Sequence, residues 1–121
     1  MKKVFVTAFV ILALYAGTLI AQDNTEKKKI EFLIASIENL KGAKFIRSGS
    51  EYDGKAAAAH LRMKLQKAGG NVQSADDFIR LCASKSYITG KPYMISSSDG
   101  KTIKAEEYFR EKLKEYYSSQ K

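Results

Sequence analysis

A small set of side chains in this sequence could carry out chemistry, and His60 is at its centre. It is the only histidine, and a histidine acts as a general base when a nucleophile and an orienting group lie beside it. The available nucleophiles are the thiol of the single cysteine, Cys82, and the hydroxyls of Ser84 and Ser86. A small hydrolase that uses His60 with Cys82 or with a loop serine is therefore one hypothesis.

Each of these residues also has a structural interpretation, which we favour over catalysis. His60 stands beside Leu61 at the edge of an apolar helical stripe, where a half-buried ring commonly hydrogen-bonds a neighbouring loop. Cys82 shares an apolar face with Phe78, which is typical of a small core residue. The two serines lack the strand–turn–helix setting of a nucleophile elbow. One cysteine and one histidine leave a zinc site two ligands short, so we expect neither a metal nor another cofactor.

The segment Gly49–Lys55 nearly matches a phosphate-binding loop, because its residues fit the pattern G-x-x-x-x-G-K. However, Ala56 stands where the motif needs a hydroxyl to hold Mg²⁺. Glu51 and Asp53 also place negative charge where a polyanionic phosphate would bind. We therefore expect no nucleotide, and interpret the two glycines as providing backbone freedom in a turn.

The charge of the chain favours an anionic partner. Lys and Arg number 21 against 13 Asp and Glu, which gives a formal net charge of +8. Such a charge suits anionic partners such as lipid head groups, polyanionic envelope polymers or nucleic acid, although lysines dispersed along helices more often serve solubility alone. The expected contact surface combines the Ser48–Asp53 turn, the His60 edge of a helix and the Ser84–Tyr93 loop. Its candidate binding residues are Arg47, Tyr52, His60, Lys64, Ser84, Ser86 and Tyr93.

The N-terminus predicts a secretory signal peptide over residues 1–21. Two lysines precede the apolar run Val4–Ile20, and Ala21 offers a small residue for cleavage. The alternative is an uncleaved anchor, since the run is just long enough to span a membrane. Cleavage near Ala21 would make the protein periplasmic or secreted, and membrane contact is expected only through this segment if it is retained.

The remainder predicts a polar leader over residues 22–29 and a single domain over residues 30–117. Apolar residues at helical spacing follow Ile30, and a short strand is expected at Lys44–Arg47. Asp99-Gly100 between two β-prone runs predicts a hairpin. We expect an α+β fold in which a small antiparallel sheet of about three strands packs against about four helices, in the order α-β-α-α-β-β-α.

Four segments in this order resemble the YfeK-like family, a group of small exported bacterial proteins of unknown function. The segments are Phe45–Gly49, His60–Leu65, Ser74–Ile79 and Ala83–Tyr93. Two departures are visible, because that family usually carries Asn in place of Ser48 and often Ser in place of Tyr87. The resemblance implies the fold and the compartment, and it implies no activity.

Three functional hypotheses follow. The first, which we prefer, is a non-enzymatic binding or accessory module for a component of the cell envelope. The second is the hydrolase based on His60. The third is a structural or stress-related protein whose Cys82 thiol forms an intermolecular disulfide.

Overall fold

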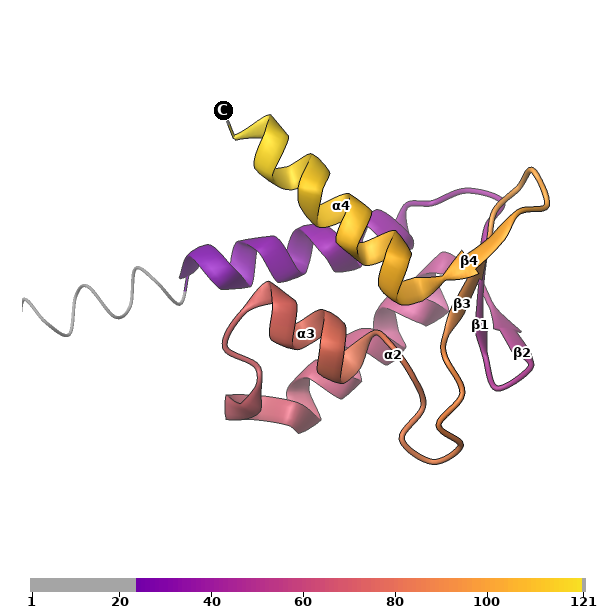
Figure 1. The fold of residues 1–121 in the computed structure, drawn as a ribbon, viewed down its shortest axis with the longest axis horizontal. Coiled ribbons are helices and arrows are strands. Elements are labelled where there is room, and N and C mark those ends of the chain that lie inside the picture. The colour runs from indigo at the N-terminus through magenta and orange to yellow at the C-terminus, as the bar shows by residue number, and fades with distance from the viewer. Residues whose placement is uncertain (1–23, 121) are drawn as a thin grey trace, which may run out of the picture.

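The computed structural model describes residues 24–120, which form an antiparallel sheet packed against helices (Figure 1). An N-terminal helix covers residues 24–38. The remaining elements are β1 (Lys44–Arg47), β2 (Ser50–Tyr52), α2 (Gly54–Ala68), a 3₁₀ turn (Gly69–Asn71), α3 (Ala75–Cys82), β3 (Met94–Ser96), β4 (Thr102–Lys104) and α4 (Ala105–Ser119). The predicted α+β class is confirmed.

The sheet has four strands in the order β2-β1-β3-β4, where the sequence predicted about three. The additional strand is β2, whose residues were expected to form part of a turn. Directly paired residues on neighbouring strands point to the same face of a sheet. The register therefore aligns Tyr52, Phe45, Ile95 and Ile103 in one row across the four strands. Phe45 and Ile95 are the fully buried members of this row, so the row marks the face that the helices cover.

A two-residue turn makes the β1–β2 hairpin possible. Arg47 pairs with Ser50, so only Ser48 and Gly49 lie between the strands. Both residues have positive φ, 51° and 85°, which is the conformation that a type I′ hairpin turn requires. Asn adopts this left-handed conformation more readily than Ser does. The backbone therefore explains why Asn suits position 48.

Replacing Ser48 by Asn is expected to stabilise the fold by about 0.5 kcal/mol, because Asn-Gly is the preferred pair for a type I′ turn. Urea unfolding would measure the change. Ser50→Asn is the matched control, since Ser50 lies in β2 with extended backbone, where Asn is disfavoured. A loss of stability in Ser48→Asn would contradict this account of the turn.

Residues 24–29 belong to the N-terminal helix, so they are not the loose leader that their polarity suggested. Glu26 explains the difference, because its carboxylate joins this helix to α3. One of its oxygens accepts a hydrogen bond of 2.9 Å from the backbone N–H of Ala75. The other pairs with the Lys29 ammonium group at 2.8 Å. A polar segment is thus held in the fold by the Glu26 side chain, whose partner Ala75 lies far away in sequence.

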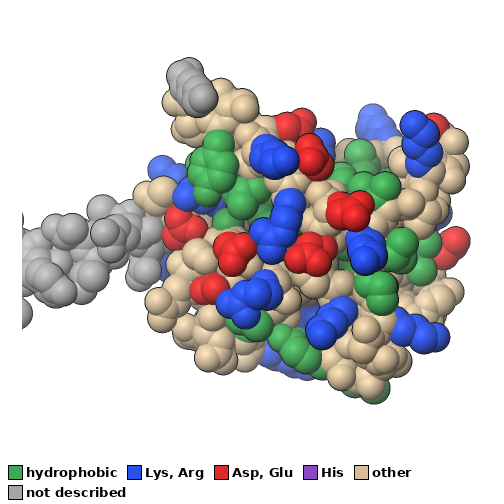
Figure 2. Space-filling view, in the orientation of Figure 1, with side chains coloured by type: hydrophobic (Ala, Val, Ile, Leu, Met, Phe, Trp, Pro, Cys, Tyr) green, Lys and Arg blue, Asp and Glu red, His purple; other side chains and the backbone are tan. Residues whose placement is uncertain are grey.

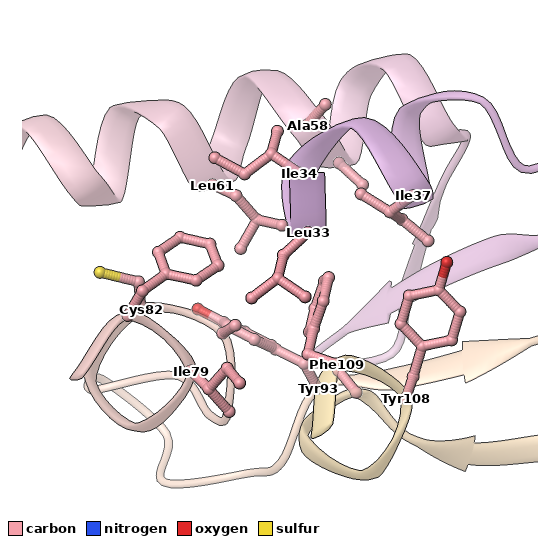
Figure 3. Close-up of a cluster of buried hydrophobic side chains, with 14 of the residues drawn as sticks. Leu33, Ile34, Ile37, Ala58, Leu61, Ile79, Cys82, Tyr93, Tyr108 and Phe109 are labelled. Atoms are coloured by element: carbon pink, nitrogen blue, oxygen red, sulfur yellow. The ribbon is translucent and has the colours of Figure 1, made fainter. Parts of the chain in front are cut away.

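A single hydrophobic core joins all the described helices to the sheet. Its buried members among the described residues lie between Ile30 and Phe109. Figure 3 shows side chains converging from the N-terminal helix (Leu33, Ile34, Ile37), α2 (Ala58, Leu61), α3 (Ile79, Cys82) and α4 (Tyr108, Phe109), with Tyr93 among them. The predicted signal peptide lies outside the described residues. Within residues 24–120, no helix is both long and apolar enough to cross a bilayer.

Candidate functional site

Tyr93 connects the sheet to α2 and is the centre of the site. Only 2% of its surface is exposed, and its ring packs on Phe45 with centroids 5.2 Å apart. Its hydroxyl accepts a hydrogen bond of 2.8 Å from the Lys64 ammonium group. The Nε2 atom of His60 lies 3.5 Å from the same oxygen. Three of the predicted site residues therefore meet at one phenolic oxygen.

Lys64 also holds the loop that precedes β3. Its ammonium group donates to the carbonyl of Lys85 at 3.3 Å. The same group lies 4.8 Å from the centre of the Tyr93 ring and 5.0 Å from that of Tyr87, within the range of cation–π attraction. Lys64 thus links α2 to residues 84–93 and keeps a positive charge at the surface of the site.

Ser84 and Ser86 are brought to this region, but their hydroxyls are engaged within the loop. The Ser84 hydroxyl donates to the carbonyl of Ile79 at 2.6 Å, near the end of α3. Ser86 is 6% exposed, and its hydroxyl accepts from the Thr89 N–H at 3.3 Å. These contacts give both serines a part in shaping the loop.

Arg47, Tyr52 and His60 line a hollow of about 290 Å³ between the sheet and α2. Arg47 follows Phe45 by two residues and so shares its face of β1, while Tyr52 pairs directly with Phe45. Alanines of α2 and Met63 complete the wall. The hollow therefore has a largely apolar lining to which Arg47, His60 and Tyr52 contribute the residues with polar groups.

A second hollow, of about 470 Å³, lies beside the C-terminal part of α2. It is lined by Lys64, Lys67, Ala68, Asn71, Leu81 and Tyr87. Lys67 and Met63 were not among the predicted site residues. Helical spacing could have identified both residues, because Met63 and Lys67 follow His60 by three and seven positions. Residues at these spacings lie on the same side of a helix.

Arg47, Lys64 and Lys67 line the two hollows, and Lys85 and Lys91 lie in the loop that contains Tyr87. Among residues 24–120, no carboxylate lies within 4.0 Å of Arg47, Lys64, Lys67, Lys85 or Lys91. By contrast, Arg62 pairs with Glu38 at 3.2 Å and Arg110 pairs with Asp76 at 2.9 Å. Figure 2 shows a face on which acidic and basic side chains alternate, with no histidine visible. The hollows therefore carry positive charge without a nearby carboxylate. Other described lysines also lack a carboxylate within 4.0 Å, namely Lys27, Lys28, Lys41, Lys44, Lys55, Lys101 and Lys104.

The surroundings of His60 disfavour its charged form. Partial burial lowers the pKa of His60 below its ordinary value of 6.5, and the positive charges of Arg47, Lys64 and Lys67 lower it further. The ring is therefore neutral at pH 7, and the charge of the site at that pH comes from arginine and lysine.

Acidification below pH 6.5 is expected to destabilise the protein through His60. The unfolded chain takes up a proton near pH 6.5, whereas the folded state takes it up only at lower pH, so stability falls as the pH drops through this interval. Urea unfolding between pH 7.5 and pH 5 would measure the slope, which His60→Gln should reduce. Glu26 and Glu38 have pKa values lowered below 4.5, so their contribution to the stability of the fold is lost only at more acidic pH. An unchanged slope in His60→Gln would contradict the assignment.

The arrangement around His60 gives little support to covalent catalysis. Its ring contacts Tyr93, and among the described residues no hydrogen bond joins it to Cys82, Ser84 or Ser86. Burial raises the pKa of the Cys82 thiol, although Lys64 opposes the shift, and a thiol needs a lowered pKa to react as a thiolate. Residues 24–120 also hold no cluster of three or more His, Cys, Asp or Glu side chains that could bind a metal.

Comparison with known proteins places the chain in a family. Residues 24–117 match the family described as "Family of unknown function (DUF5329)". The chain is also 34% identical over 93 residues to "Uncharacterized protein YfeK" of Salmonella typhimurium, an alignment that covers 77% of each protein. No solved structure matches. The match covers the described helices and strands except the last two residues of α4, and the chain accordingly belongs to this DUF5329 family, as the resemblance to YfeK-like proteins suggested.

Proposed function

We propose that this protein is an exported, non-enzymatic module that binds an anionic component of the cell envelope through the two hollows beside α2. The observation that carries the proposal is the group of cations around them, Arg47, Lys64, Lys67, Lys85 and Lys91, with no carboxylate within 4.0 Å among residues 24–120. Export rests on the signal-like residues 1–21.

The lining of the hollows favours a ligand with both an anionic and an apolar part. The smaller hollow places Arg47 and His60 over an apolar wall, and the larger one places Lys64 and Lys67 beside Leu81 and Tyr87. An arginine can hold a phosphate or carboxylate group with two parallel hydrogen bonds. Volumes of about 290 and 470 Å³ fall at the lower end of the range for small-molecule sites. They suit a terminal group of a polymer or a small anionic molecule.

The experiment is the binding of the purified protein to lipid-free anionic polymers extracted from cell envelopes, measured at low and at high salt. We expect binding at low salt that is lost at high salt, because surface electrostatic contacts are screened. Arg47→Gln and Lys67→Gln should each weaken binding several-fold. Lys114→Gln is the matched control, since it removes the same charge from α4, where Lys114 pairs with Glu111.

Two results would overturn the proposal. One is the absence of binding to any lipid-free polymer fraction at low salt. The other is an equal loss of binding in Lys114→Gln and in Arg47→Gln, because that would make net charge, and not the hollows, the determinant. Circular dichroism of each variant would confirm that the fold is intact.

A further inference from the structure

The loop between α3 and β3 carries two adjacent apolar side chains at its tip. Tyr87 is 67% exposed and Ile88 is 91% exposed. Single exposed apolar residues are ordinary on protein surfaces. These two are consecutive, in a loop that extends to the lower edge of the molecule in Figure 1. The loop also contacts its surroundings, because the Lys64 ammonium group lies 5.0 Å from the Tyr87 ring and the Thr89 hydroxyl lies 3.1 Å from that of Ser48.

The loop is held in one shape by its own hydrogen bonds. The N–H of Ser86 donates to the carbonyl of Lys91 at 3.0 Å, and the N–H of Gly90 donates to that of Ser86 at 2.8 Å. A bridge between Lys85 and Pro92 closes its base. These bonds fix the shape of the loop before binding, so its insertion into a partner would lose little conformational entropy.

Lysines surround the base of this apolar tip. Lys85 and Lys91 flank it in the loop, and Lys67 lies on α2 in the hollow that Tyr87 also lines. All three are exposed, and none has a carboxylate within 4.0 Å in the part of the chain that the structure describes. The apolar side chains therefore lie at the tip of the loop, and the positive charges lie near its base.

We propose that this loop docks on a bilayer that bears anionic lipids, with the Tyr87–Ile88 tip in the interface and Lys67, Lys85 and Lys91 at the head groups. Charge complementarity selects the anionic surface. The apolar tip would face the acyl chains, and the lysines at the foot of the loop would face the head groups, which matches the layers of a bilayer. A projecting tip enters a fluid surface, whereas a protein partner would need a groove to receive it. The proposal goes beyond the binding of a polymer in the hollows, and beyond membrane contact through the N-terminal segment alone.

The test uses a tryptophan at the tip, because the chain contains none. In Ile88→Trp, we expect a blue shift of fluorescence, and quenching by brominated lipids, with vesicles of mixed phosphatidylcholine and phosphatidylglycerol. Vesicles of phosphatidylcholine alone should leave the spectrum unchanged. Adding Lys85→Gln or Lys91→Gln to Ile88→Trp should weaken partitioning about fivefold each, the effect of one basic residue near an anionic surface.

Ile103→Trp is the matched control, because Ile103 is a 39% exposed apolar residue of β4, outside the loop. The emission of its tryptophan should be the same with both kinds of vesicle as in buffer. All variants share the same N-terminal residues, so a difference between positions 88 and 103 reports the loop itself. A water-like spectrum of Ile88→Trp on anionic vesicles, or an equal shift on neutral ones, would overturn the proposal. Either result leaves polymer binding in the hollows to be judged separately, because that test contains no lipid.

Discussion

Gly54→Ala is expected to destabilise the protein by about 2–3 kcal/mol, a large effect for the addition of one methyl group. Gly54 is the first residue of α2 and lies against the end of the N-terminal helix. A Cβ atom at this position would lie 2.4 Å from the carbonyl oxygen of Ile37 and 3.0 Å from that of Glu38. Since both contacts are with backbone, the two helices would have to move apart. Thermal unfolding should show a decrease in Tm of about 10 °C or more.

Gly70→Ala is the control for this effect. Gly70 does not have positive φ, and a Cβ atom there would meet nothing within 4 Å. Its replacement should therefore change stability by less than about 1 kcal/mol. Similar stabilities of Gly54→Ala and Gly70→Ala would show that the helices separate at no cost, contrary to the packing described.

Cys82 is expected to react with thiol reagents about 10³-fold more slowly in the folded protein than in the unfolded chain. The side chain is 1% exposed, and burial raises the pKa of its thiol. Reaction then requires an opening of the structure, whose free energy for an ordinary domain is at least several kcal/mol. Labelling kinetics with and without urea would measure the ratio, and a non-reducing gel of the native protein should show no disulfide-linked dimer.

The matched control is Ser118→Cys in a Cys82→Ala background, which moves the single thiol to an exposed position on α4. That thiol should react at nearly the same rate in the folded and unfolded states. Rapid labelling of native Cys82 would contradict its burial. It would also favour the hypotheses in which Cys82 acts as a nucleophile or forms an intermolecular disulfide.

Gly54 shows why local patterns predicted the fold better than they predicted the site. The pattern G-x-x-x-x-G-K and its turn-like composition led us to expect backbone freedom at this glycine. The interpretation was wrong for Gly54, whose requirement is close contact with residues 37 and 38 of another helix. It was correct for Gly49, whose φ of 85° lies in a tight turn. The two glycines look alike in the sequence, because the contact of Gly54 depends on how two helices pack.

The sequence by itself determined the α+β class, the family, the hairpin at Asp99-Gly100 and most of the apolar core. The fold class, the hairpin and the core follow from periodicity and turn chemistry, which act over a few neighbouring residues. The family followed from the resemblance of four segments in order. It also indicated Arg47, Tyr52, His60, Lys64 and Tyr93, which the fold gathers around α2. Only the tertiary structure decided that Ser84 and Ser86 hydrogen-bond within their own loop, and that basic residues around the hollows have no nearby carboxylate. Those features depend on distances between residues far apart in the chain, which local spacing does not encode.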